Sequence, residues 1–109
     1  MRAYSWNDWN LRHVGRHNVT PAEARYVADY ARSPHPEYVG DGKWHVRGKT
    51  SAGRWLQVIY VCPDDAEVDP DSLSPADLLA FSDGRAQVVY VIHARELTEA
   101  EKRQARKRG

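Results

Sequence analysis

Two segments of the chain carry residues suited to phosphate chemistry. His93 and Arg95 lie two residues apart just after the stretch 87–92, which is rich in β-branched and aromatic residues and free of Gly and Pro. Residues two apart in a strand point to the same side. A cation and an imidazole at the end of a buried strand need water, an anion or a carboxylate beside them. The stretch 87–98 is therefore expected to form one edge of a site, although His93 also suits a packed polar role.

The second segment is a strand with a basic face. From residue 43 the pattern has a period of two, with Lys43, His45, Arg47 and Lys49 alternating with Trp44, Val46 and Gly48. Such a face could bind an anionic polymer, and Trp44, Trp55 and Tyr60 could stack on unpaired bases. A solvated strand edge protected against aggregation, with Trp44 in the core, is the alternative.

Histidines near the N-terminus could supply proton transfer. A helix capped by Asn7 or Asp8 and running to about His17 would place Asn10, His13 and His17 in one stripe. Imidazole titrates near neutrality and suits proton transfer, whereas arginine suits charge stabilisation. His13 and His17 could instead hydrogen-bond the helix to the sheet, or bind a metal at their four-residue spacing. No third ligand is evident, so no metal and no other cofactor are predicted.

The net charge of +1 conceals a segregation of charges. Residues 63–83 contain seven acids and no Lys or Arg, leaving sixteen bases and eight acids elsewhere. This surplus favours a polyanionic partner. The acidic segment is expected to be an excursion docked away from the site by Leu79 and Phe81, or else a tethered mimic of phosphate groups that faces the basic surface.

The remaining pattern predicts one α+β domain over 1–109. An edge strand at 4–6 and the first helix precede a helix begun by the capping box Thr20–Glu23, with Tyr26, Val27, Tyr30 and Ala31 on its buried side. Strands at 43–49 and 54–61 form a hairpin, and the acidic insertion 63–84 carries a short helix from Pro75. The strand from 87 and a helix capped by Thr98 and Glu101 complete the order β-α-α-β-β-(insertion)-β-α, with the N-terminal helices on one face of a small, antiparallel-rich sheet. Cys62 is alone and reads as a small core residue.

In this order the sequence resembles the BrnT family of type II toxins. The resemblance lies in three groups of residues: Trp6, Asn10, His13, Arg16, His17 and Val19 before a Pro-Ala-Glu-Ala helix start; Arg47-Gly48-Lys49-Thr50 and Gly53-Arg54 around the hairpin; and Ala94-Arg95 before Thr98 and Glu101. Ala105 stands where the family pattern leads us to expect an aromatic residue, and the acidic insertion has no counterpart in that pattern.

The resemblance implies a RelE-like fold and a metal-independent endoribonuclease that cleaves messenger RNA and is held inactive by a ribbon-helix-helix antitoxin, with which it could form a higher-order complex. Attack by a 2′-hydroxyl needs a proton acceptor, a proton donor and fixed cations around the phosphorane. For these tasks the sequence offers Arg95, Arg47 and Arg54 for charge, His17 or His13 for proton transfer, and Lys43, Lys49, His45 and Trp44 for RNA binding.

Two alternatives stay open. One is a catalytically inactive module of the same fold that binds RNA or a protein, in which Arg95 forms only a salt bridge to Glu101 or another acid. The weaker one is a metal-dependent hydrolase that uses His13 and His17. No apolar run approaches the roughly 20 residues of a membrane span, and residues 1–6 lack a secretory signal, so a cytoplasmic protein without a membrane partner is expected.

Overall fold

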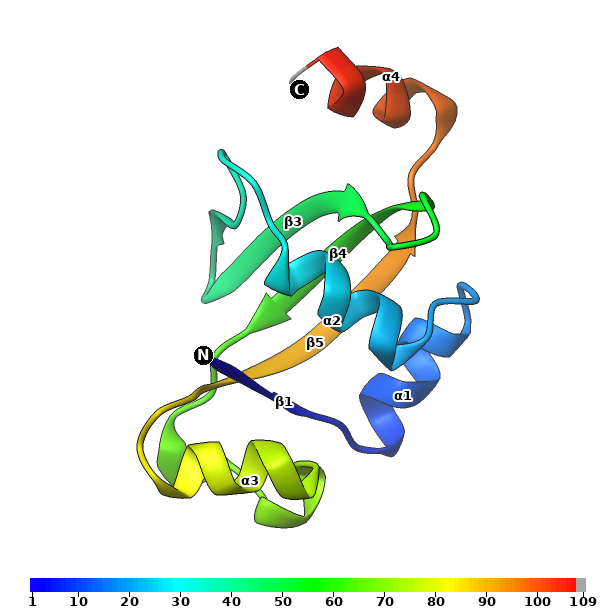
Figure 1. Cartoon of the computed structure of the whole chain (residues 1–109). Helices are drawn as coiled ribbons and strands as arrows, with labels where there is room; N and C mark the ends of the chain where they lie inside the picture. The colour runs from blue at the N-terminus through cyan, green and yellow to red at the C-terminus, as the bar shows by residue number, and fades with distance from the viewer. Residues whose placement is uncertain (108–109) are drawn as a thin grey trace.

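The computed structural model describes residues 1–107 and is an α+β fold with a five-stranded mixed sheet and four α-helices (Figure 1). The elements are β1 (Arg2–Ser5), α1 (Asp8–Gly15), α2 (Pro21–Asp29), β2 (Glu37–Gly40), β3 (Lys43–Lys49), β4 (Trp55–Val61), α3 (Pro75–Ser82), β5 (Gln87–Glu96) and α4 (Glu99–Lys107). The sheet order is β1-β5-β4-β3-β2, in which only β1 and β5 run parallel. No helix among the described residues is long and apolar enough to cross a membrane.

The predicted order of elements is confirmed except for one strand. β2 pairs with residues 43–45 of β3 and was missed, because its side chains are largely exposed and show no alternation of apolar and polar residues. The first helix ends at Gly15 rather than near His17, and a turn follows in which Asn18 has a positive φ of 55°. The terminal helix agrees with prediction as far as Lys107, and the predicted contribution of Arg108 lies outside the described residues.

Helices α1 and α2 cover one face of the sheet, as predicted (Figure 1). Val14 and Val27 pack there against Val46, Val58 and other strand residues in the main hydrophobic core, and Cys62 packs half-buried at its margin. The prediction for Tyr30 was wrong, because this side chain is 67% exposed while Ala24 and Ala28 are buried in its place. Small residues let the helix approach the sheet closely, and the bulky tyrosine is left at the surface.

The acidic insertion forms a second layer on the opposite face of β1 and β5. Leu73, Ala3 and Val88 are buried there, with Leu78 and Phe81 packed against them. The predicted anchor Leu79 is instead 60% exposed.

Asp77 faces inward in this layer. Its carboxylate accepts hydrogen bonds from Arg25 at 2.7 and 3.1 Å and from the backbone N–H of Tyr4 at 3.1 Å. One of the seven acids is therefore a buried structural link rather than part of a solvated surface.

The insertion and α4 lie at opposite ends of the sheet (Figure 1). The insertion enters β5 at Gln87, whereas Arg95 lies eight residues further along the same strand, roughly 26 Å at the usual rise. The acids of the insertion therefore do not face Arg95 and the neighbouring part of β3. This placement agrees with the docked excursion and keeps the acids away from Arg95.

Candidate functional site

The face of β3, β4 and β5 opposite α1 and α2 carries the basic residues. Arg47, Gln57 and Arg95 are directly paired across the three strands, and His45, Ile59 and His93 form the next row. Paired residues of antiparallel neighbours point to the same face, while the alternate residues Val46, Val58 and Ala94 lie in the core with the helices. We call the opposite surface, made by these two rows together with Lys43, Lys49 and Trp55, the open face.

A β-bulge puts Arg95 on the open face. In β4, Ile59 and Tyr60 are consecutive, but their partners in β5 are His93 and Val91. Ile92, which lies between these partners, is therefore an extra residue in β5. Val89 and Val91 point into the main core, and strict alternation would have sent Arg95 there as well. The extra residue reverses the alternation, as bulges do. Ala94 takes the core position and Arg95 faces outward.

Arg47 and Arg95 meet at a single carboxylate from α4. Arg95 donates two hydrogen bonds to Glu101, at 2.7 and 2.8 Å, and Arg47 donates one at 3.1 Å. Glu101 also completes the predicted capping box, since it accepts from the Thr98 N–H at 2.8 Å. The hydrogen bonds from Arg95 hold the pKa of Glu101 well below its usual range, so this carboxylate is charged at neutral pH and binds the arginines as an anion.

Gln57 extends this network to His45. Its side-chain oxygen lies 3.4 Å from Arg95 Nη2 and 3.0 Å from His45 Nε2. Because arginine only donates, the oxygen is the acceptor in both contacts, and His45 donates from Nε2. Burial lowers the pKa of His45. The imidazole is thus favoured in its neutral form, with Nδ1 as the basic nitrogen, beside the two arginines.

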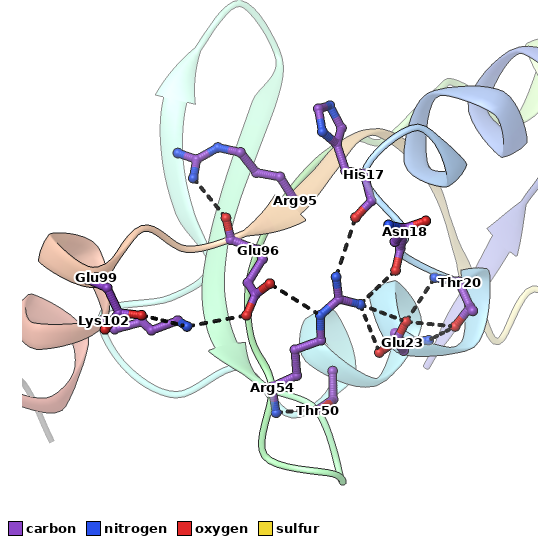
Figure 2. Close-up of polar contacts among 10 residues, drawn as sticks. All are labelled: His17, Asn18, Thr20, Glu23, Thr50, Arg54, Arg95, Glu96, Glu99 and Lys102. Atoms are coloured by element: carbon purple, nitrogen blue, oxygen red, sulfur yellow. Dashed lines mark hydrogen bonds and ion pairs between the residues drawn. The ribbon is translucent and has the colours of Figure 1, made fainter.

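Other predicted residues lie elsewhere. Arg54 is on the helix side of the sheet, where its guanidinium binds Glu23 and the backbone oxygens of His17 and Asn18 at 2.7–3.4 Å (Figure 2). Figure 2 shows the Arg95 side chain extending away from Arg54. Arg54 therefore holds the α1–α2 turn against the sheet and does not join the other two arginines.

The N-terminal histidines divide between two places. His13 stacks on Trp9 with ring centroids 3.7 Å apart, and its Nδ1 lies 2.8 Å from the Trp9 carbonyl oxygen. His17, beyond the end of α1, packs edge-on against His93 at 5.5 Å. Burial and the neighbouring His17 and Arg95 lower the pKa of His93. The two N-terminal histidines do not form the predicted stripe on one helix.

The predicted RNA-binding residues also separate. Lys43 and Lys49 are exposed at the two ends of β3, with the Lys49 ammonium 5.4 Å from the centre of the Trp55 ring. Trp44 lies on the helix-covered face, against the core and edge-on to Tyr38. Within residues 1–107 no group of three His, Cys, Asp or Glu side chains is placed to hold a metal ion.

Sequence reasoning missed Gln57 and the shared role of Glu101. Gln57 is the one polar residue within the apolar run 55–61, which is a signal that its side chain has a partner. Glu101 was noted only as a helix cap and as a partner for Arg95, because nothing local indicates that Arg47, 54 residues earlier, reaches the same carboxylate.

The comparisons with known proteins add no relative. No protein-family model matches the chain, and no curated protein and no solved structure shows a significant match.

Proposed function

We propose that this protein is an endoribonuclease that cleaves messenger RNA without a metal ion, acting as the toxin of a type II toxin–antitoxin pair with a RelE-like fold. The observation that carries the proposal is the row Arg47–Gln57–Arg95 on the sheet face opposite α1 and α2, with His45 beside it. Two arginines a few ångströms from one carboxylate oxygen can equally bind two oxygens of a phosphate.

In this mechanism a backbone phosphate replaces Glu101 between Arg47 and Arg95. The arginines stabilise the charge that grows on the phosphorane as the 2′-hydroxyl attacks. His45 Nδ1 accepts the hydroxyl proton, since the lowered pKa of this residue favours its neutral form. The P–O5′ bond then breaks to leave a 2′,3′-cyclic phosphate, and the leaving 5′-oxygen takes up a proton from solvent. His45 thus takes the role that the sequence assigned to His17 or His13. Lys43 and Lys49 flank the row and bind neighbouring phosphates.

The proposed partner is a ribbon-helix-helix antitoxin in the same cytoplasm, in a complex that can assemble further. It would have to block the open face or hold α4 against it. An adjacent reading frame that encodes a short ribbon-helix-helix protein would support this part of the proposal.

A second candidate is a binding module of the same fold without catalysis. It is favoured by the Glu101 carboxylate, which already forms an ion pair with each arginine in this structure. The metal-dependent hydrolase has no comparable support, because the His13 Nδ1 is engaged by the Trp9 carbonyl and His17 lies beyond the helix.

The test is cleavage of a labelled messenger RNA by purified Arg95→Ala and Arg47→Ala variants. We expect each to lose roughly ten- to a thousand-fold in rate while remaining folded, because each removes a transition-state contact. Arg85→Ala is the matched control, since the only described partner of this exposed arginine's side chain is Asp83, near the insertion. Wild-type activity should persist in excess EDTA.

Three outcomes separate the candidates. Loss in the two variants with an unchanged control supports the nuclease. Binding of RNA without cleavage by wild type leaves the inactive module. Loss of activity in EDTA that a divalent metal restores would favour the hydrolase.

A further inference from the structure

A cleft of about 680 Å³ opens beside the arginine row, at the outer edge of β3. β2 covers only residues 43–45 of that edge. Beyond it the cleft is walled by the end of α2 and the segment after it, by the β3–β4 turn and by the C-terminal half of α4. Arg47 belongs to both the cleft and the open face, so a ligand bound there could continue onto the arginine row.

The lining combines aromatic rings with positive charge. On one wall the ring centroids of Tyr26 and Tyr30 lie 4.5 Å apart. On another wall the Trp55 ring lies under the Lys49 ammonium. Four cations line the cleft, namely Arg32, Arg47, Lys49 and Arg106, and none of its described residues is acidic. Aromatic side chains and flanking cations are the features by which proteins hold unpaired bases and their phosphates.

Size and exposure fit the same ligand. Sites for small ligands usually enclose roughly 300–1,000 Å³, so the cleft has room for a nucleobase with its sugar. Tyr30 is 67% exposed and borders this space, leaving much of its surface free for contact. Ala105, with its small side chain, keeps the α4 wall open, while Ser33, Ser51 and Gln104 offer hydrogen-bonding groups at the rim.

We propose that this cleft binds one nucleobase of single-stranded RNA, which stacks on Tyr30 while an adjoining phosphate binds Arg47. The inference rests on RNA as the ligand of the proposed function, and it adds a base-binding subsite next to the cleavage row. Stacking contributes most of the affinity at this subsite, and the rim groups select among bases.

The test measures binding apart from cleavage. The probe is a fluorescent 2′-O-methyl hexanucleotide, which lacks the attacking hydroxyl, compared with versions that carry one abasic residue at each position. In wild type we expect one position at which removal of the base weakens binding about five- to a hundred-fold, as for other stacked bases. Tyr30→Ala should weaken binding of the intact probe by a similar factor, and should not weaken binding of that abasic probe further.

Two variants control the result. Tyr30→Phe keeps the ring and should bind like wild type. Tyr38→Ala removes a tyrosine of similar exposure, 55%, that does not line the cleft, and should leave the dependence on the base unchanged. Thermal unfolding of each variant shows that it is folded.

The inference is overturned if Tyr30→Ala binds the intact probe as wild type does, if it weakens intact and abasic probes equally, or if wild type does not bind the probe. Its failure is distinct from that of the nuclease proposal, which is judged on unmodified RNA. Cleavage that is indifferent to Tyr30 refutes the cleft alone. Base-dependent binding without cleavage supports the cleft and refutes the nuclease.

Discussion

Replacing Glu101 by Gln should tighten RNA binding, because this carboxylate competes with phosphate for Arg47 and Arg95. Glutamine keeps a side-chain oxygen for the Thr98 N–H, so the cap of α4 survives. What is lost is the negative charge between the two guanidinium groups. The perturbation therefore acts on the arginines while leaving the helix in place.

The magnitude follows from the exposure of the three side chains. Glu101, Arg47 and Arg95 are 18%, 23% and 29% exposed, so their ion pairs are partly screened by solvent. At the upper end of values for surface pairs, each is worth up to about 1 kcal/mol. A phosphate that displaces the carboxylate from both arginines loses roughly 1–2 kcal/mol, which corresponds to a five- to thirty-fold change in affinity.

The assay is fluorescence anisotropy with a non-cleavable RNA at several salt concentrations. Glu99→Gln makes the same change in net charge on the same helix, but Glu99 is 76% exposed and, within residues 1–107, its carboxylate pairs only with Lys102. We expect Glu101→Gln to bind five- to thirty-fold more tightly than wild type and Glu99→Gln to change little. Equal tightening in both variants would refute competition at the arginines and leave a long-range field effect.

Two further predictions concern pH and stability. Burial lowers the pKa of His45 below the ordinary 6.5, so this base becomes protonated only in acid. The pH profile of kcat/KM should therefore fall only below about pH 6.5. The residual activity of His45→Gln should lack this acid limb, whereas His17→Gln should retain it. An unchanged profile in His45→Gln would assign the proton transfer to another group. Asp77→Ala should lower the free energy of unfolding by roughly 2–4 kcal/mol, because it leaves the Tyr4 N–H buried without an acceptor and Arg25 without its main partner. Asp77→Asn, which keeps one acceptor oxygen, should lose less, and equal denaturant midpoints for both variants and wild type would contradict this account.

Local signals in the sequence were sufficient to predict most elements. Each of the capping boxes at Thr20 and Thr98 sets a helix start through contacts within four residues, and both are present. The basic alternation at 43–49 likewise predicted which residues share a face of β3. β2 could not be predicted in this way, because its short exposed segment follows two prolines and is held by pairing with β3 rather than by its own pattern.

Arg54 and Asp77 show where residue type alone misleads. The sequence suggested phosphate binding for Arg54 and a solvated or phosphate-mimicking surface for the acids of the insertion. Each instead binds an opposite charge from a distant part of the chain, Glu23 for Arg54 and Arg25 for Asp77. A charged residue in a sequence reports what it could bind, and only the fold determines whether that capacity is already used within the protein.

The bulge at Ile92 shows the limit of periodicity for the site itself. In a regular strand, alternate residues point to the same face, here Val89, Val91, His93 and Arg95. An unbroken strand would therefore bury all four or expose all four. Neither arrangement is stable for both the valines and the arginine. A conflict of this kind within one strand is itself a signal, because an extra residue that reverses the alternation resolves it. The core then receives Val91 and Ala94, while Arg95 reaches Gln57, Glu101 and the open face. One unpaired residue in β5 thus decides that this strand can contribute to a site at all.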